Sequence, residues 1–480
     1  MRAPILLCLA LLGCPKTPAP EAAAEGVRPF PEALPERPFV MPEVERATLS
    51  NGLQLAVVRN DEVGLFNVRL FLRGGSSLDP AGKEGLAELT FDMLDRGAAG
   101  RSAAELAKAL KPLGGTVGAG AGRDSAAVSV SGPSKNLEPL LDLWADVLLR
   151  PDFPADEWSL LQSKAVADHE ASLEQPTEVG RRVYRHVAYG DAYTGRLTTS
   201  ASLGGLTRGD LVAHHAAVLD PSRAVLMAGG DVDLATLVPL LEARLGSLGA
   251  ASPLPLPAPA IPAEGEGEVI YVVDKPGAPQ SVLRALLPVM DRTDPAWWPF
   301  MVGNTAFGGA FTARVNMNLR EDKGWTYGAR CGLDDNTGPS LWLCSTSVQS
   351  DATVVGLAEL RKETRDVLGD RPITADELAY FQGYLVNGFY GSYETPGELL
   401  GELWDIWTYG LPADWLERYV PSVQAVDVAG ANAALRSAID PDRIAWIVVG
   451  DLATHREGLE ALGLPVVELD RDGRPVAEAP

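Results

Sequence analysis

The segment Lys83–Gly97, with the sequence KEGLAELTFDMLDRG, is predicted to be helical and carries two carboxylates that could do chemistry. Glu88 and Asp92 stand four residues apart, so on a helix they share one face. Carboxylates bind hard cations such as Mg²⁺ and Ca²⁺. The segment contains no histidine, so it offers none of the imidazole ligands that suit zinc. What these side chains can do depends on the elements that position them.

The length and charge of the chain narrow the classes of protein to which it can belong. With 480 residues it exceeds a single hydrophobic core, so two or more domains are expected. Lys and Arg total 41 and Asp and Glu total 64, which gives a net charge of −23. This negative balance repels nucleic acid and anionic lipid surfaces. We therefore expect no nucleic-acid partner.

The N-terminal sequence MRAPILLCLALLGC is typical of a secretion signal. Its apolar run, Ile5–Leu12, is too short to cross a bilayer. The ending LLGC resembles a bacterial lipoprotein signal, which predicts removal of residues 1–13 and a lipid on Cys14; an ordinary signal peptide with an incidental cysteine is the alternative. Residues 14–44, rich in Pro, Ala and Glu, would form a disordered tether. We expect a periplasm-facing lipoprotein of the bacterial cell envelope, bound to the membrane through this lipid only, and Pro15 favours the outer membrane.

Two cysteines remain beyond the signal region. Cys331 and Cys344 flank the turn DDNTGP between two short apolar segments, so they could face each other across a hairpin. The cell envelope permits a disulfide there. Two free buried thiols are the alternative, because the sequence does not give the Cα separation that decides it.

A repeat divides the chain into two halves. Asp-Pro-x-Arg, an apolar stretch, Gly-Asp and a helical stretch follow one another from Asp220 and again from Asp440. A Pro- and Gly-rich linker, residues 249–267, is predicted between an N-terminal domain, 45–248, and a C-terminal domain, 268–480. Strand-like and helix-like segments do not alternate strictly. We therefore expect an α+β fold of two homologous domains, each a mainly antiparallel sheet packed with helices.

Several stretches resemble the insulinase/pitrilysin family of zinc metallopeptidases, the inverzincins, whose helix signature is H-x-x-E-H. The likeness runs from about Leu49 to Asp451. It includes the NGL of residues 51–53, the stretch RGGSSLDPAGKEGLAEL, and FGGAFTARVNMNLREDKGWTYGA at residues 307–329. The resemblance implies two like domains that are joined into half of a clam-like chamber.

The zinc positions of the family pattern hold other residues in this chain. The two His positions are Glu88 and Asp92, the general-base Glu is Phe91, and the third ligand falls near Asp168, with Glu170 the nearest acidic alternative. Family enzymes hold zinc with two imidazoles and a carboxylate while a Glu takes a proton from the bound water. Because Phe91 cannot accept a proton, we expect a degenerate site and no metal cofactor in this chain. The scattered histidines do not replace the ligands: His169, His186, His214 and His215.

The second half retains two further residues of the family motif. These are Arg320 in NLRED and Tyr327 in GWTYGA, which in the family hold the substrate and stabilise the developing oxyanion opposite the zinc. The alternatives are an exposed arginine and a packed strand aromatic. A degenerate zinc helix with a retained Arg/Tyr motif resembles the non-zinc subunit of two-subunit bacterial members. This resemblance implies a homologous partner subunit that carries the zinc, and peptides or unfolded polypeptides as substrates.

The resemblance also implies how the substrate is bound and why the degenerate helix persists. The substrate would add a strand to a sheet edge, and FLRGGSSL, residues 71–78, is the stretch that resembles this edge. The helix would be retained because its apolar residues pack the domain: Leu86, Leu89, Met93 and Leu94.

Two other functions are compatible with these residues. One is an inactive, lipid-anchored scaffold or binding subunit, which has no physical reason to keep the Arg/Tyr motif. The other is a self-contained hydrolase that uses Glu88, Asp92 and Asp168, which would require bound metal and lose activity to chelators. We expect the chain to be inactive alone and active only with a partner that contains H-x-x-E-H.

Overall fold

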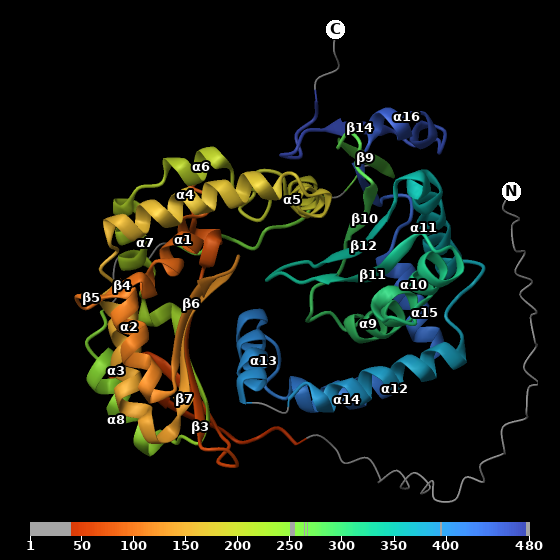
Figure 1. Ribbon diagram of the computed structural model, residues 1–480. Helices are drawn as coiled ribbons and strands as arrows, with labels where there is room; N and C mark the ends of the chain where they lie inside the picture. The colour runs from red at the N-terminus through yellow and green to blue at the C-terminus, as the bar shows by residue number, and fades with distance from the viewer. Residues whose placement is uncertain (1–39, 250–254, 264, 266, 394–395, 477–480) are drawn as a thin grey trace, which may run out of the picture. The chain divides into compact units, whose positions relative to one another are not determined.

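The described part of the chain forms two six-stranded sheets packed with helices (Figure 1). The computed structural model describes residues 40–249, 255–263, 265, 267–393 and 396–476. The predicted signal peptide, the lipidation site Cys14 and most of the predicted tether therefore lie outside the described residues. Across the described ranges, no helix is long and apolar enough to span a membrane.

The first half builds its sheet from strands that are far apart in sequence, in the order β1-β2-β8-β3-β7-β6. All neighbouring strands are antiparallel except β2 and β8. The strands are β1 (Val44–Thr48), β2 (Gln54–Arg59), β3 (Leu65–Arg73), β6 (Thr116–Ala121), β7 (Ser125–Pro133) and β8 (Ala224–Gly230), with a short pair, β4 (Gly97–Ala98) and β5 (Arg101–Ser102). The helices are α1 (Leu86–Asp92), α2 (Ala103–Leu110), α3 (Leu137–Leu149), α4 (Ala155–Ser172), α5 (Pro176–Tyr189), α6 (Ser200–Gly205), α7 (Arg208–Val218) and α8 (Leu234–Leu245).

The second half repeats this order with β9-β13-β10-β12-β11, and β14 is added beyond β9. Here β9 pairs in parallel with both β13 and β14, so each sheet is mixed but mainly antiparallel. The strands are β9 (Val269–Asp274), β10 (Gln280–Pro288), β11 (Thr326–Asp334), β12 (Leu341–Gln349), β13 (Ala445–Gly450) and β14 (Val466–Leu469). The helices are α9 (Trp297–Asn304), α10 (Arg314–Asn316), α11 (Thr353–Leu368), α12 (Ala375–Gly391), α13 (Pro396–Tyr409), α14 (Trp415–Ala425), α15 (Val428–Ala438) and α16 (Leu452–Glu460).

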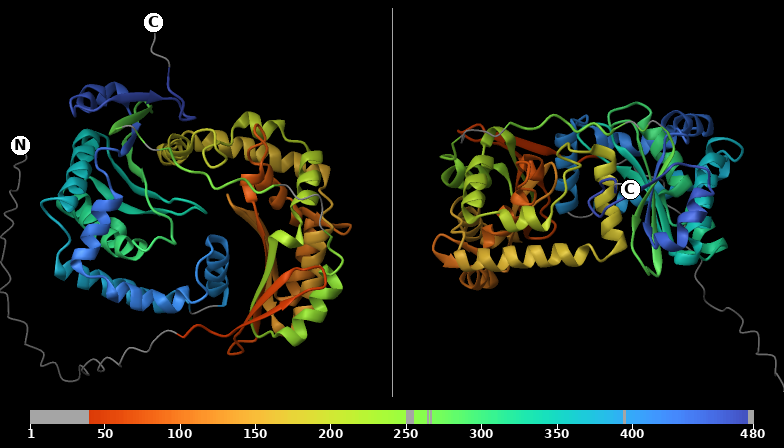
Figure 2. Two further views of the ribbon diagram at one scale, coloured as in Figure 1. Left: turned by 180° about the vertical axis from the view of Figure 1, so that it is seen from behind. Right: turned by 90° about the horizontal axis from the view of Figure 1, so that it is seen from above.

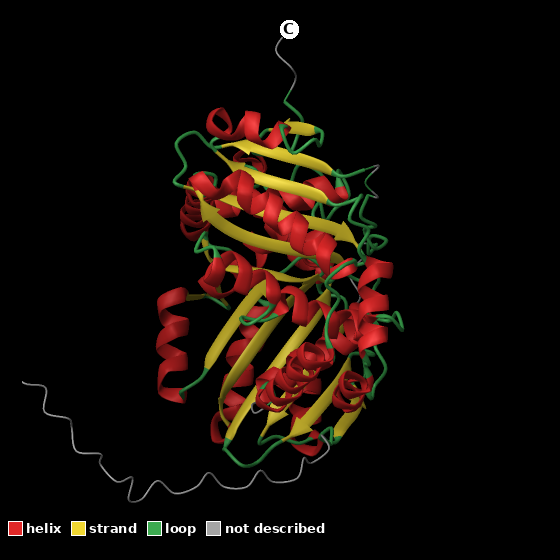
Figure 3. Cartoon of the chain, turned by 90° about the vertical axis from the view of Figure 1, so that its right-hand side faces the viewer, coloured by secondary structure: helices red, strands yellow, loops and turns green. Residues whose placement is uncertain are grey.

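The repeated sequence motif forms the same unit in both halves. The copy that begins at Asp220 forms β8 and α8, and the copy that begins at Asp440 forms β13 and α16. Each strand lies between a parallel and an antiparallel neighbour at the same place in its sheet. Figure 3 shows the strands of both sheets with helices packed over them. The predicted α+β fold of two homologous domains is confirmed.

Strand β3 is central in the first sheet, contrary to the prediction that FLRGGSSL forms a substrate-binding edge. Residues 75–78 of this stretch form a short 3-10 turn and no strand. Only residues 71–73 belong to β3, where they pair with β7 on one side and, up to Leu72, with β8 on the other. The alternating pattern explains this position, because Phe66, Val68, Leu70 and Leu72 are buried in the helix-covered core. The edges of this sheet are β1 and β6.

Each half covers part of the other half's sheet with one helix. Helix α13 of the second half packs on β3 and β8, and α5 of the first half packs on β10 and β13. The ring of Trp404 on α13 stacks on Phe71 with centroids 4.5 Å apart. On the other side, a Cβ at Gly180 of α5 would lie only 3.2 Å from the Val282 side chain. A larger residue at this position would make the side chains of the second sheet shift, so Gly180 favours the close approach of α5.

Polar contacts join the two halves where their central hairpins end. Arg123, between β6 and β7, donates a 2.8 Å hydrogen bond to the carbonyl oxygen of Asp335 beyond β11. The Tyr184 hydroxyl donates to Asp334 at 2.9 Å. The charge of Arg123 is largely matched, because its Nε also donates to Asp124 at 2.8 Å. These bonds fix the hairpin ends against α5.

We predict that Trp404→Ala strongly destabilises the protein, because it removes a buried ring between α13 and the first sheet. The expected loss is about 3–5 kcal/mol, the usual range for truncating a buried large aromatic. Urea unfolding followed by tryptophan fluorescence and circular dichroism measures it. The control is Leu160→Ala, which truncates a 64% exposed leucine on α4 and should cost little. Equal effects of the two substitutions would show that α13 does not depend on this contact.

Candidate functional site

A cleft of about 610 Å³ lies in the first half, lined by residues between Ser76 and Leu203. Its walls come from α1 and from α4 and α5, which meet at a sharp bend and are both yellow in Figure 2. The positions predicted from the zinc pattern, Glu88, Asp92 and Asp168, all line this cleft. The structure therefore brings the degenerate positions to one site.

A buried aspartate sets the position of α1 at this cleft. Asp79, only 3% exposed, accepts hydrogen bonds from the backbone N–H of Gly85 at 2.9 Å and of Ala87 at 2.8 Å. Gly85 has a φ of 100°, and a Cβ there would lie 2.7 Å from Leu203, so only glycine fits. Burial raises the pKa of Asp79 to about 6, although these N–H groups and Arg196 oppose the rise.

The position of the general base belongs to the core. Phe91 is 1% exposed and packs in the helix-covered core of the first half, and it does not line the cleft. The predicted packing residues Leu86, Leu89, Met93 and Leu94 are also buried there, which confirms their predicted role. Helix α1 is therefore kept in place by apolar packing on one side while Glu88 and Asp92 face the cleft on the other.

The carboxylates of α1 face the cleft without partners. Within the described ranges, neither Glu88 nor Asp92 has a side-chain hydrogen bond or an ion pair. Burial, and then the charge of Asp92, raises the pKa of Glu88. Burial also raises the pKa of Asp92. Asp168 differs from them, because it forms an ion pair with Lys164 on the same helix. Glu170 is exposed and does not line the cleft.

These residues do not fit a zinc ion. Helix α1 has no imidazole, Phe91 is buried, and Lys164 neutralises Asp168. Among the residues that the structure describes, no group of three or more His, Cys, Asp or Glu side chains could hold a metal ion. The other histidines have separate surroundings. His214 and His215 are buried, His186 contacts the carbonyl oxygen of Gly195, and His169 lines the cleft.

Arginines of α5 form a basic wall that the sequence analysis missed. Arg181, Arg182 and Arg185 all line the cleft. Arg182 is 8% exposed, donates to the carbonyl oxygen of Thr198 at 2.6 Å and pairs with Asp472 at 2.9 Å. The signal was the sequence RRVYR, whose spacing puts these arginines on neighbouring positions of one helix. Only the fold shows which acidic residues they oppose.

The Arg/Tyr motif lies outside this cleft. Tyr327, on the edge strand β11, is 91% exposed. Arg320 lies in the π-helical turn Met317–Asp322, with its guanidinium 4.4 Å from the ring centre of Phe311 and its Nε 3.3 Å from Glu321. Among the described residues, all those that line the cleft belong to the first half. The two predicted sets of site residues therefore occupy separate places in this chain.

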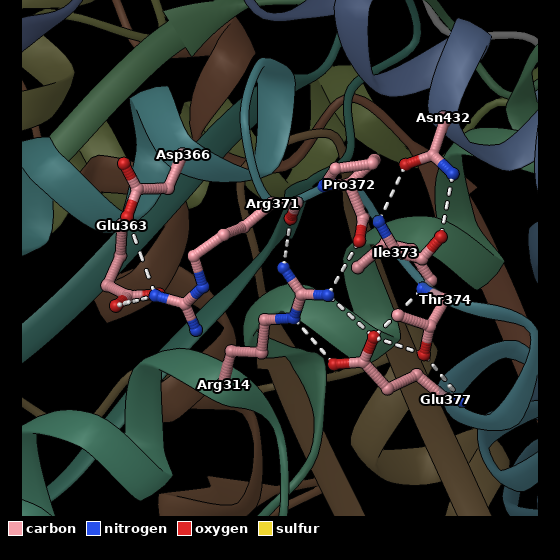
Figure 4. A network of polar contacts seen from close by, with 9 residues as sticks. All are labelled: Arg314, Glu363, Asp366, Arg371, Pro372, Ile373, Thr374, Glu377 and Asn432. Atoms are coloured by element: carbon pink, nitrogen blue, oxygen red, sulfur yellow. Dashed lines mark hydrogen bonds and ion pairs between the residues drawn. The ribbon is translucent and has the colours of Figure 1, made fainter.

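Polar contacts of Arg314 hold α10, which precedes Arg320 and Tyr327 in the chain, against the start of α12 (Figure 4). Arg314 donates two 2.6 Å hydrogen bonds to Glu377 and a 2.8 Å bond to the carbonyl oxygen of Pro372. Although burial raises it, the bonds from Arg314 and Thr374 lower the pKa of Glu377 to about 2. Beyond Tyr327, a disulfide joins Cys331 of β11 to Cys344 of β12, which face each other in register.

Comparison with known proteins assigns both halves to one family. Residues 56–194 match the family described as Insulinase (Peptidase family M16), and residues 205–382 match the Peptidase M16 inactive domain. The chain therefore belongs to the M16 (insulinase) family of peptidases.

Its sequence relatives are named zinc proteases. An uncharacterized zinc protease of Mycobacterium leprae is 24% identical over 291 residues, which is 60% of this chain and 65% of the relative. One of Streptomyces coelicolor is 23% identical over 375 residues, 75% of this chain and 79% of the relative. The chain is thus a homologue of M16 zinc proteases.

Solved structures share the fold. The M16 inactive domain from Pseudomonas fluorescens superposes with a TM-score of 0.78 at 24% identity, covering 85% of this chain and 98% of that one. The periplasmic protease PqqL from Escherichia coli gives a TM-score of 0.74 at 17% identity, covering 92% of this chain and 49% of PqqL. This likeness establishes the arrangement of strands and helices.

We predict that Asp79 makes the protein less stable as the pH rises from 4 to 7. Its folded pKa, about 6, lies above the value of 3.8 for a free side chain, so folding binds a proton in this window. The stability that Asp79 contributes is complete below pH 4 and is lost as the pH passes 6. The change should approach about 3 kcal/mol.

Urea unfolding of the wild type and of Asp79→Asn at several pH values isolates this effect, because other groups titrate equally in both. The stability difference, wild type minus variant, should fall between pH 4 and 7. A difference that stays constant, or that rises, would contradict the assignment.

Proposed function

We propose that this chain is the non-zinc subunit of a heteromeric M16 peptidase that degrades peptides or unfolded polypeptides. In this assembly a homologous subunit with H-x-x-E-H carries the zinc, and this chain supplies Arg320 and Tyr327. The zinc, when bound in that subunit, activates water for attack on the peptide bond. This chain would be inactive alone.

One observation carries the proposal: Tyr327 is 91% exposed, at a distance from its own chain's cleft, whose lining residues all belong to the first half. A hydroxyl that serves packing would normally be covered, and one that serves this chain's own site would line its cleft. Its exposure on an edge strand instead leaves it free to contact another molecule. The degenerate helix α1 supports the same division of roles, because it lacks both imidazole ligands and a base.

The chemistry expected of this chain is electrostatic. The Tyr327 hydroxyl and the Arg320 guanidinium would donate hydrogen bonds to the carbonyl oxygen of the substrate as negative charge develops on it. Arg320 is suited to this because its guanidinium is held over Phe311 and only partly exposed, so little order is lost on binding. The outer edge of β11 could also pair with an extended peptide next to Tyr327.

We further propose that the chain works in the bacterial cell envelope as a periplasm-facing lipoprotein, anchored through Cys14. The signal-like N-terminus supports this location. The disulfide between Cys331 and Cys344 also fits an oxidising compartment. A structural neighbour, PqqL, is itself named a periplasmic protease.

We predict that peptide cleavage requires both subunits and depends on the Tyr327 hydroxyl. Cleavage of a fluorogenic peptide is measured for this chain, for a zinc-bearing M16 subunit of the same cell, and for the mixture. Tyr327→Phe should lower kcat of the mixture roughly a hundredfold, the usual effect of removing one oxyanion donor. The matched control is Tyr384→Phe, which removes the hydroxyl of another tyrosine that is 52% exposed.

Other results would decide for the alternatives. If the mixture cleaves no faster than the zinc subunit alone, the chain is a lipid-anchored scaffold or binding subunit. If this chain cleaves alone and a chelator stops it, Glu88, Asp92 and Asp168 form a working metal site. If both tyrosine variants lose activity equally, the hydroxyl of Tyr327 has no special role.

A further inference from the structure

A single buried side chain joins the loop before α10 to strand β11. Asn316 is completely buried, and both ends of its amide are bonded to the backbone. Its Nδ2 donates to the carbonyl oxygen of Phe311 at 2.6 Å, and its Oδ1 accepts the N–H of Ala329 at 2.9 Å. One amide therefore satisfies an acceptor and a donor that belong to two separate segments.

Both of these segments support the Arg/Tyr motif. The ring centre of Phe311 lies 4.4 Å from the guanidinium of Arg320. Ala329 lies just after Tyr327, where the register of β11 against β12 shifts. A shift of this kind redirects the side chain at which it occurs. The Asn316 amide therefore links the ring that supports Arg320 to the irregularity that directs Tyr327 outward.

Two other bonds near this point hold β11 but not the loop before α10. The hydroxyl of Thr326 accepts from the N–H of Gly328 at 3.0 Å, a bond within the strand itself. Asn304 of α9 donates to the carbonyl oxygen of Cys331 at 3.0 Å, further along the strand. Because neither bond reaches that loop, Asn316 carries the hydrogen-bonded link between the loop and the strand.

We propose that Asn316 is a positioning residue, which holds the Arg320 guanidinium and the Tyr327 hydroxyl at a fixed separation. Donors that stabilise a developing oxyanion act most strongly when they are fixed in advance, and a displacement of about 1 Å can lower a rate roughly a hundredfold. A buried amide that is bonded at both ends supplies this rigidity. The effect on cleavage rests on the proposed function, whereas the link itself is a property of this chain alone.

A second buried asparagine provides a matched control. Asn432 of α15 is 5% exposed, and its amide also bonds one backbone donor and one backbone acceptor, both of Ile373 (Figure 4). Its third bond goes to the carbonyl oxygen of Val428 on its own helix. Replacing either asparagine by alanine leaves buried backbone groups unsatisfied, so both variants should lose stability in urea unfolding. The positioning role predicts further effects for Asn316→Ala alone.

Hydrogen exchange of the full chain on its own, followed by mass spectrometry with fragmentation to single residues, tests the link without a partner. In Asn316→Ala the amide of Ala329 should exchange at least about tenfold faster, and exchange should also rise across residues 311–313, because both segments lose their common anchor. Asn432→Ala should leave both places unchanged. Unchanged exchange in Asn316→Ala, or an equal rise in both variants, would overturn the proposal.

Peptide cleavage by the mixture with a zinc-bearing M16 subunit tests the effect on Tyr327. Asn316→Ala should lower kcat about tenfold and change KM little, whereas Asn432→Ala should leave kcat unchanged. In the Tyr327→Phe background, Asn316→Ala should lower kcat by about threefold at most, because the hydroxyl that Asn316 positions is gone. Independent losses that multiply, or an equal loss in both asparagine variants, would refute the positioning role.

The two measurements separate this inference from the proposed function. If the wild-type mixture does not cleave, the proposed peptidase role fails, and the exchange of Ala329 still decides whether Asn316 links the two segments. If Asn316→Ala does not fold, Asn316→Ser, which retains a hydroxyl, takes its place with the same expected directions. A wild-type Ala329 amide that exchanges as fast as an exposed amide would also rule out the link.

Discussion

Helix α5 is the element on which both the cleft and the joining of the halves depend. Its apolar face, with Val179 and Val183, is buried against Val282 and Val449 of the second sheet. The same helix turns Arg181, Arg182 and Arg185 toward the cleft of the first half. Because one rigid helix carries both faces, the second domain fixes where the basic wall of the cleft stands. Arg182 can lie almost fully out of water because it pairs with Asp472 and donates to the carbonyl oxygen of Thr198.

The two halves use this arrangement reciprocally. Helix α13 lies on the first sheet, where the guanidinium of Arg73 sits 3.7 Å from the ring centre of Trp407 and donates to its carbonyl oxygen at 3.0 Å. On the second sheet, Arg284 lies 5.4 Å from the ring centre of Tyr184 on α5. In each sheet, an arginine lies against an aromatic ring of the helix that comes from the other half. The contacts that stabilise each sheet therefore also set the position of the two halves relative to each other.

The sequence correctly predicted the features that follow from local patterns and from the repeat. The apolar positions of α1 follow from helical spacing, and the duplicated strand–helix unit follows from the two Asp-Pro-x-Arg motifs. The predicted edge at residues 71–78 failed because strand neighbours are set by pairing with β8, which lies about 150 residues later in the chain. The role of Arg182 and Arg185 was missed for the same reason, since their environment is built from segments on both sides of the linker.

The candidate site also illustrates why a helix can lose its chemistry and keep its place. In α1 the residues Leu86 and Phe91 pack in the core and do not line the cleft, whereas Glu88 and Asp92 do. Replacing an imidazole by a carboxylate on the open face therefore leaves the core intact, whereas charge placed at Phe91 would have to be buried. Holding α1 in place has a cost in stability. Asp79 bonds the backbone at the start of α1, but its carboxylate is buried, which raises its pKa. The fold thus fixes the position of α1 but leaves the side chains on its open face free to vary. For this reason Glu88 and Asp92 can replace the two histidines without disturbing the core.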